Sequence, residues 1–280
     1  TRPFSFEGRR RSTQAEDGAT LRRALSFHEV EPSRLPTEAA LGAAIRKMAA
    51  ELGALRGAPV LESYTGPVLF ADEAAPTLFA DLFAPQLSGR RPPLSARPST
   101  GGAEQGSELS GRLGRLVLPV FLGAVDDPTL ASDGGRTLLG SYEVDDEGVP
   151  ARTLTLVDRG VLKTLAMGRR PRKEIAASNG HARGSSYLAP APQVSNLLVR
   201  TSSGRSHEEL KKELIQQATA QGLPCALLVR ALAPGRTGEM DPFEMSFGEA
   251  RPRSPLGDPA LAGTVFPDGR AIIRGTDDPV

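Results

Sequence analysis

The sequence predicts an α+β fold with a mostly antiparallel, curved or barrel-like β-sheet and about three helices. Turn-forming residues are frequent, with 30 Gly and 24 Pro among 280 residues, and this favours a β-rich chain with many loops. Two β-prone runs, 153–157 and 161–165, are joined by Asp158-Arg159-Gly160, and a glycine where positive φ is needed indicates a hairpin. Such short connections favour antiparallel pairing, because parallel neighbours need a longer crossover.

Three stretches have helical periodicity. The first follows Thr37, a good N-cap residue, and its apolar face consists of Leu41, Ile45, Met48 and Leu52. The second covers residues 72–84, with one side formed by Leu78, Phe79, Leu82 and Phe83. The third covers residues 206–220, where Ser206 and Glu209 have the spacing of a capping box.

Other apolar runs predict strands. They are 58–71, interrupted at 65–67, then 116–125, 194–200 and 225–232, and a final hairpin of 263–266 with 271–274. Residues 88–112 have almost no large apolar side chains and are expected to form a long loop. The polar, Arg-rich residues 1–36 predict a linker or the remnant of a missing N-terminal domain, followed by one domain over 37–280.

Charge and cysteine content narrow the range of partners. With 34 basic and 33 acidic residues, the chain lacks the overall basic excess expected of a nucleic-acid-binding domain, so no nucleic acid is expected. No apolar run approaches the roughly 18 residues that span a membrane, so no membrane association is expected. The single cysteine, Cys225, forms no internal disulfide and fits a reducing compartment. We therefore expect a cytoplasmic protein.

Taken one by one, the residues that could be catalytic or bind metal are better explained by structural roles. Neither His28-Glu29 nor His207-Glu208 is followed by a second ligand one helical turn later, so zinc-protease spacing is absent from both. Cys225 lies in an apolar run, which predicts a buried, inert thiol. The acidic groups are Asp72-Glu73, Asp126-Asp127 and Asp145-Asp146-Glu147. Turn and cap roles are favoured for them over acid–base pairs or a cation site.

Five motifs follow one another between about residues 58 and 275. They are Tyr64-Thr-Gly-Pro-Val-Leu-Phe70 with Glu73-Ala-Ala75, Asp126-Asp-Pro-Thr129, Gly140–Pro150 with Leu156–Leu162, Ser178-Asn-Gly-His-Ala-Arg183 with Pro192–Asn196, and Pro267-Asp-Gly-Arg270 with Arg274-Gly275. In this order and spacing the chain resembles the C-terminal region of the TldD/PmbA family, once called modulators of DNA gyrase. The resemblance implies a metalloprotease-type scaffold that acts on unfolded peptides.

The resemblance also implies a zinc site in the family's peptidases, formed by a His-Glu-x-x-x-His helix and a later Cys. Residues 78–85 correspond to that helix. The first His position is Ala80, the Glu position is Asp81 and the second His position is Pro85. Cys225 precedes the region of the later Cys, and residues 239–253 contain none. We therefore expect no catalytic residue, metal or cofactor in this chain, which would be a PmbA-like metal-free subunit.

Two functions from different classes remain open. The first is a non-catalytic subunit that binds peptide beside a metal-bearing TldD-like partner in a homo- or heterodimer, with Asn179, His181 and Arg183 as candidate peptide contacts. The alternative is an active hydrolase that uses carboxylates, either Asp81 or the Asp145-Asp146-Glu147 group. A role in modulating another enzyme, such as gyrase, rests on the family's old name alone.

Overall fold

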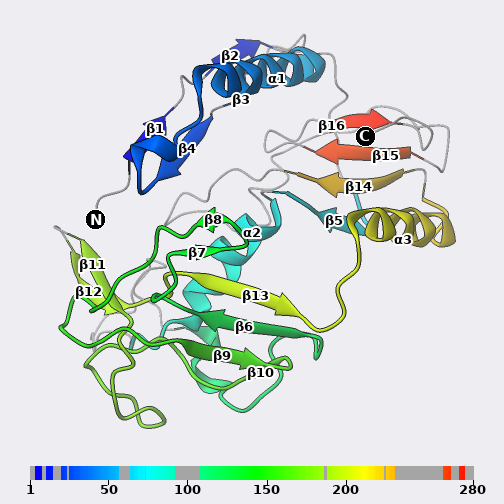
Figure 1. The fold of residues 1–280 in the computed structure, drawn as a ribbon. Coiled ribbons are helices and arrows are strands. Elements are labelled where there is room, and N and C mark those ends of the chain that lie inside the picture. Colours follow the sequence, from blue (N-terminus) through cyan, green and yellow to red (C-terminus); the bar gives the residue numbers. More distant parts are fainter. Residues whose placement is uncertain are drawn as a thin grey trace. The chain divides into compact units, whose positions relative to one another are not determined.

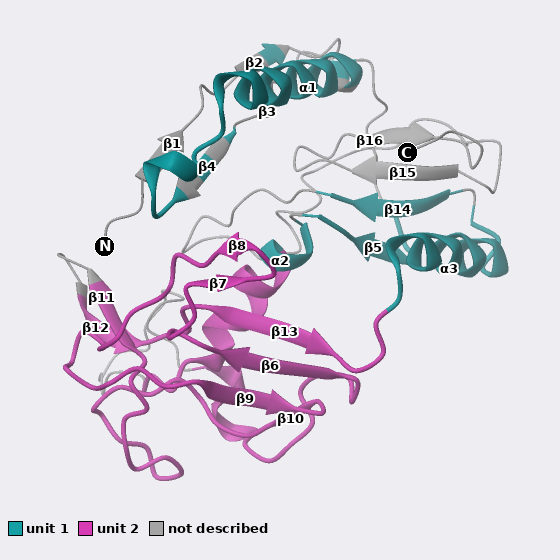
Figure 2. Ribbon diagram, in the orientation of Figure 1, with its two compact units in different colours: residues 1–77, 205–235, 240–280 teal, residues 78–204, 236–239 magenta. Residues whose placement is uncertain are grey.

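The chain divides into two compact units (Figure 2). A computed structural model describes residues 4–7, 11–14, 20–23, 25–56, 64–72, 74–91, 107–185, 188–223, 225–230, 261–265 and 271–274. Unit 1 comprises residues 1–77, 205–235 and 240–280, and unit 2 comprises residues 78–204 and 236–239. Three of the five motifs lie within unit 2: Asp126–Thr129, Gly140–Pro150 with Leu156–Leu162, and Ser178–Arg183 with Pro192–Asn196.

Unit 2 is organised around a four-stranded antiparallel sheet of order β10-β9-β6-β13 (Figure 1). Its strands are β6 (Leu122–Asp126), β9 (Leu154–Asp158), β10 (Val161–Leu162) and β13 (Leu197–Thr201). One face packs on a buried cluster that consists of Leu87, Ala124, Leu156, Val157, Leu162 and Leu165. The apolar runs predicted as strands therefore supply this core.

The predicted β9–β10 hairpin is confirmed. Arg159 and Gly160 both have positive φ, 45° and 76°, which is the backbone twist of a two-residue hairpin turn. A side chain on Gly160 would place its Cβ 2.2 Å from the backbone oxygen of Leu118. The predicted strand at 116–125 begins only at Leu122, because the preceding residues bond to the hairpin instead: Leu116 pairs with Val161 in an isolated bridge.

Two further hairpins and a run of helical turns complete unit 2. The hairpins are β7 (Ser132–Asp133) with β8 (Arg136–Thr137), and β11 (Ala182–Ser185) with β12 (Leu188–Pro192). The helical run begins with α2 (Ala74–Leu78), which belongs to unit 1 as far as Thr77. In unit 2 it continues as the π-turn η2 (Phe79–Phe83) and the 3-10 turn η3 (Ala84–Leu87), and η5 (Glu108–Gly111) is a separate 3-10 turn. Much of the predicted long loop, residues 92–106, lies outside the described residues.

Unit 1 contains a second four-stranded sheet, of order β16-β15-β14-β5. The strands are β5 (Val68–Phe70), β14 (Cys225–Val229), β15 (Leu261–Val265) and β16 (Ala271–Arg274). The predicted final hairpin is confirmed as the antiparallel pair β15–β16. Strand β14 is parallel to both β5 and β15. The short connections in the sequence had predicted antiparallel neighbours. Because unit 2 and α3 intervene between β5 and β14 in the chain, the crossover is long enough for parallel pairing.

The two longer predicted helices are confirmed. Helix α1 (Glu38–Arg56) follows Thr37, whose Oγ1 accepts a hydrogen bond from the backbone N–H of Ala40 at 3.3 Å. Helix α3 (His207–Ala220) begins with the predicted capping box between Ser206 and Glu209. The second predicted helix is shorter than expected, since only α2 is α-helical there.

The region predicted as a linker, residues 1–36, contains short strands. These are β1 (Phe4–Glu7) paired with β4 (Ser26–Glu29), β2 (Arg11–Gln14) paired with β3 (Thr20–Arg23), and the 3-10 turn η1 (Pro32–Arg34). Its role as a remnant of another domain stays a prediction. Among the described strands the sheets are mostly antiparallel and none closes into a barrel. No described helix combines the length and apolar character needed to cross a membrane.

Candidate functional site

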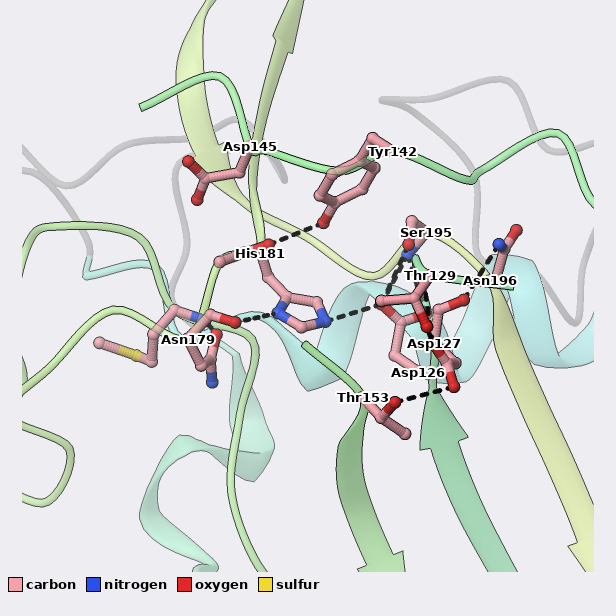
Figure 3. Close-up of polar contacts among 12 residues, drawn as sticks. Asp126, Asp127, Thr129, Tyr142, Asp145, Thr153, Asn179, His181, Ser195 and Asn196 are labelled. Carbon is pink, nitrogen blue, oxygen red and sulfur yellow. Dashed lines mark hydrogen bonds and ion pairs between the residues drawn. The ribbon is translucent and has the colours of Figure 1, made fainter. Parts of the chain in front are cut away.

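A buried aspartate and a buried histidine, Asp126 and His181, lie side by side among the polar motifs of unit 2 (Figure 3). Asp126 is the last residue of β6, and His181 directly precedes β11. Both side chains are completely shielded from solvent, and His181 Nε2 lies 3.1 Å from Asp126 Oδ2. The other ring nitrogen, Nδ1, lies 2.9 Å from the carbonyl oxygen of Asn179. Because a carbonyl only accepts hydrogen bonds, Nδ1 carries a proton.

The Asp126 carboxylate has further partners in Ser195. The backbone N–H of Ser195 donates to both carboxylate oxygens at 3.0 Å, and its hydroxyl donates to Oδ2 at 3.2 Å. A nucleophilic serine needs a base such as histidine within hydrogen-bond reach of its hydroxyl. Here the aspartate stands between the serine and the histidine, and the histidine is sealed from solvent. The arrangement therefore holds β6, β11 and the start of β13 together and offers no nucleophile–base pair.

Asp127 performs the turn role that the sequence predicted. Its Oδ1 accepts hydrogen bonds from the backbone N–H of Thr129 at 3.0 Å and from the Thr129 hydroxyl at 2.6 Å. Its Oδ2 accepts from the Thr153 hydroxyl at 2.9 Å. Burial acts to raise the pKa of Asp127, but these hydrogen bonds and the nearby His181 outweigh it and lower the pKa below its usual value.

Asp145 is also a turn residue, and it is buried. Its Oδ1 accepts from the backbone N–H groups of Glu147 and Val149 at 3.0 and 2.8 Å, and its Oδ2 accepts from that of Ala182 at 3.0 Å. The neighbouring Glu147 accepts from the backbone N–H of Arg169 at 2.5 Å. The predicted turn chemistry is confirmed for Asp145, because three backbone N–H groups donate to its two carboxylate oxygens.

Two asparagines fix the backbone around the pair. The Asn179 amide accepts from Met167 N–H at 2.7 Å and donates to the Leu165 carbonyl at 2.8 Å. The Asn196 amide donates to the carbonyls of Asp127 and Leu130 at 3.1 Å each, and accepts from Gly140 N–H at 3.0 Å. Each asparagine therefore satisfies backbone groups that would otherwise be buried without partners.

Tyr142 and Arg183 mark the outer side of the cluster. The Tyr142 hydroxyl donates to the Gly180 carbonyl at 2.9 Å, and burial, with a smaller contribution from Asp126, raises its pKa to about 12. The Arg183 guanidinium lies 4.3 Å from the centre of the Tyr142 ring, a cation–π contact. Arg183 also forms an ion pair with Asp146 at 3.0 Å.

The three predicted peptide contacts therefore have different environments. His181 is fully buried, Asn179 is committed to two backbone groups, and Arg183 is partly exposed, with about a third of its side chain accessible (32%). Sequence reasoning missed the pairing of His181 with Asp126, because the two residues are far apart in the chain and no local pattern connects them. His207 is exposed at the start of α3, as expected. Cys225 is buried and its pKa is raised by burial, as expected of an inert thiol.

The helical turn at residues 79–85 is the second candidate site. In η2 the backbone N–H of Ala84 donates to the carbonyl of Phe79, a bond that spans five residues. The wider π-turn brings residues five positions apart closer to one face than an α-helix does. Ala80 and Pro85 have this spacing and are both exposed, while Asp81 is partly buried.

The residues of this turn do not fit a zinc ion. Ala80 and Pro85 have no side-chain donor atom, and zinc sites take three or four nitrogen, sulfur or oxygen ligands. Over the part of the chain that the structure describes, no group of three or more His, Cys, Asp or Glu side chains is arranged to hold a metal ion. The spacing of the turn is thus that of the His-Glu-x-x-x-His motif, without its ligands.

Comparisons with known proteins identify the family of this chain. The family model described as the PmbA/TldA metallopeptidase C-terminal domain matches residues 63–224, more than half of the chain. A protein named metalloprotease from Archaeoglobus fulgidus is 33% identical over 105 residues, which cover 38% of this chain and 23% of that protein. A metalloprotease from Methanothermobacter thermautotrophicus is 28% identical over 161 residues, covering 57% of this chain and 34% of that protein.

A solved structure has a similar fold. The crystal structure of a candidate modulator of a DNA gyrase from Thermotoga maritima superimposes with a TM-score of 0.52 and 24% sequence identity. The match covers 72% of this chain and 41% of that one. The chain therefore matches only about a quarter to two fifths of the length of these relatives. Since the family model covers most of unit 2 and its neighbouring helices, this chain belongs to the TldD/PmbA family.

Proposed function

We propose that this chain is a non-catalytic, peptide-binding subunit of a TldD/PmbA-type assembly for proteolysis of unfolded peptides. The observation that carries the proposal is the turn at residues 79–85. It has the i, i+5 hydrogen bond that suits a His-Glu-x-x-x-His spacing, yet Ala80 and Pro85 cannot bind metal. A metal-bearing TldD-like subunit would then supply the zinc, and the relatives named metalloproteases are consistent with such a role.

The free edge of β13 is the candidate place for an extended peptide. Two backbone hydrogen bonds set the phase of this strand: Asp127 N–H donates to Asn196 O at one end, and Ser202 N–H donates to Phe121 O at the other. Because backbone groups of an antiparallel strand alternate in direction, those of Leu197, Val199 and Thr201 face away from β6.

Within unit 2, no described strand pairs with that side of β13. An extended peptide could therefore add to this edge through backbone hydrogen bonds, which suit a substrate of varied sequence. The β7–β8 hairpin approaches the strand through one side-chain contact, an ion pair of Asp133 with Arg200 at 2.7 Å. Arg183 remains the candidate side-chain contact, whereas His181 and Asn179 would act by holding the neighbouring backbone.

The alternative, a hydrolase that uses carboxylates, has less support. Asp145 accepts three backbone hydrogen bonds, Asp146 is paired with Arg183, and Glu147 accepts from Arg169. These contacts assign the acidic group to turn formation.

A cleavage assay tests the proposal. The full chain is incubated with an unfolded, fluorogenic peptide alone, with a metal-bearing family member alone, and with both. We expect no cleavage by this chain alone and a higher rate for the mixture than for the metal-bearing protein. Chelator-resistant cleavage by this chain alone would support the carboxylate hydrolase instead.

A variant of β13 tests the binding edge. Val199→Pro removes an outward-facing N–H and leaves the bonds to β6 in place, a change that edge strands tolerate. We expect it to abolish peptide binding measured by fluorescence anisotropy, whereas the matched variant Val199→Thr, which keeps the N–H, binds as the parent does. Unchanged binding by Val199→Pro would exclude this edge.

A further inference from the structure

Two segments of unit 2 lie side by side and both carry adjacent arginines. Ser88 and Ala166 form a parallel bridge, and the backbone N–H of Gly89 donates to the carbonyl of Ala166 at 2.8 Å. The residues that follow on the two segments are Arg90-Arg91 and Arg169-Arg170. The pairing thus brings two arginine pairs from distant parts of the sequence into one region.

The two segments lie so close together that only glycine fits at position 89. A Cβ on Gly89 would lie 2.7 Å from the carbonyl oxygen of Ala166 and 2.3 Å from Met167 Sδ, so a side chain here would force the segments apart. Arg172 adds a second tie, since its Nη1 donates to the carbonyl of Gly89 at 3.4 Å. Arg172 is mostly buried, with 15% of its side chain exposed, and is therefore a positioning residue.

The remaining cations of this region face solvent. We call the group of Arg90, Arg91, Arg169, Arg170 and Lys173, all of them exposed, the arginine surface. Glu174 lies 3.7 Å from Arg172 Nε, and Glu147 accepts from the backbone of Arg169. Arg91, Arg170 and Lys173 are exposed, and none of them has an ion pair with any described residue. Three exposed cations that have no ion pair with described residues favour binding of an anion.

We propose that the arginine surface binds the acidic side chains of a peptide, so that this protein prefers peptides rich in Asp and Glu. Arginine presents a planar fork of donors that matches a carboxylate. A nucleic acid is less suited, because neither segment, 88–91 or 166–173, contains an aromatic residue on which a base could stack. The net charge of the chain is also only +1. The inference rests on the proposed role in peptide binding and adds a substrate class to it.

Four labelled probes test the inference on the full chain by fluorescence anisotropy. They are a peptide of alternating Glu and Gly, its Gln and Lys counterparts, and a single-stranded oligothymidylate with the charge of the Glu peptide. The test variant is Arg170→Glu with Lys173→Glu. The matched control is Arg112→Glu with Arg115→Glu, two exposed cations of the same unit that likewise have no ion pair with described residues.

We expect the Glu peptide to bind most tightly, with an affinity that falls as salt is raised. The test variant should weaken its binding by about tenfold or more, as expected from losing several exposed charge contacts, while the control variant should leave it unchanged. Equal binding of Glu and Gln peptides, or equal losses in both variants, would overturn the inference and leave the proposed function standing. Tighter binding of the oligothymidylate would overturn it in favour of nucleic acid. Binding of no peptide at all would refute both proposals.

Discussion

Around Asp126 and His181, polar side chains are buried and their hydrogen bonds join three strands, whereas the turn at residues 79–85 exposes Ala80 and Pro85, which have no functional group. The first region is built from two of the motifs that resemble the family, Asp126–Thr129 and Ser178–Arg183, whereas residues 79–85 lie outside the five motifs. The first region retains the polar residues, and they hold the fold. The second contains a π-turn, and neither Ala80 nor Pro85 has a side-chain atom that could bind a metal ion.

The contrast teaches that a dense group of polar residues is not by itself a catalytic site. What decides is whether donors and acceptors are free and accessible. In the Asp126 cluster they are engaged with backbone groups and with each other. Breaking such contacts should cost folding free energy, while changes in the exposed turn should cost little. The loss of unfolding free energy on mutation should therefore separate the buried cluster from the exposed turn.

Removing one member of the buried pair should have the largest effect. Asp126→Ala removes the acceptor of the Ser195 N–H and hydroxyl and the carboxylate that faces the buried His181 ring. Polar groups left without partners cost about 1–3 kcal/mol each, so the free energy of unfolding measured by urea denaturation should fall by at least about 3 kcal/mol. The control, Asp133→Ala, breaks an exposed pair with Arg200 and should cost about 1 kcal/mol or less. Similar small losses of unfolding free energy in both variants would show that the buried Asp126 contributes no more to stability than the exposed Asp133.

Substitution of Asn179 should have the next largest effect. Asn179→Leu leaves the buried N–H of Met167 and the carbonyl of Leu165 without their partners. Unsatisfied buried polar groups cost about 1–3 kcal/mol each, so a loss of at least about 2 kcal/mol is expected in the same assay. Asn179→Asp keeps the acceptor for Met167 and removes only the donor, and should therefore fall between Asn179→Leu and the parent. A neutral Asn179→Leu would mean that the amide does not hold this loop.

The stability of unit 2 should depend on pH through Asp127. The pKa of Asp127 is lowered in the folded state, so the folded chain binds fewer protons than the unfolded chain in the acidic range. The stabilisation is present above the unfolded pKa of about 3.9 and is lost as pH falls through the folded value. Asp127→Asn removes this titration. Urea unfolding at neutral pH and at about pH 3 should show a smaller acid loss in the variant than in the parent, and equal losses would contradict the assignment.

The exposed turn should tolerate change. Ala80→Gln introduces a good helix former at an exposed position and should alter the free energy of unfolding by no more than about 0.5 kcal/mol. The same measurement as for Asp126→Ala therefore compares the two regions directly. A loss as large as that of Asn179→Leu would show that Ala80 is part of a packed interface.

Local patterns predicted much of the fold. Thr37, the Ser206–Glu209 capping box and the Arg159-Gly160 turn act within a few residues, and each was found where expected. The parallel pairing of β14 with β5 was missed, because it depends on a crossover that contains a whole unit. The π-turn at Phe79–Phe83 was also missed, since periodicity alone does not distinguish it from an α-helix.

The site was less predictable than the fold. The turn roles of Asp127 and Asp145 follow from residues close by in the chain, and local reasoning identified them. The burial of His181 depends on Asp126, Ser195 and Asn179, which come from separate strands and loops. Only the tertiary structure brings these groups together, so the sequence suggested a peptide contact where the ring is completely enclosed.

The zinc content of the purified full chain tests whether the turn at residues 79–85 lacks a metal site. In the proposed function the turn at residues 79–85 holds no metal, because Ala80 and Pro85 have no donor atoms. Elemental analysis after incubation with zinc and gel filtration should therefore find clearly substoichiometric metal. The variant Ala80→His with Pro85→His places two ligands five residues apart on the π-turn. Because zinc sites in proteins take three or four ligands, it should bind zinc more than the parent does but only weakly. About one tightly bound zinc per parent chain, together with cleavage that a chelator abolishes, would contradict the account.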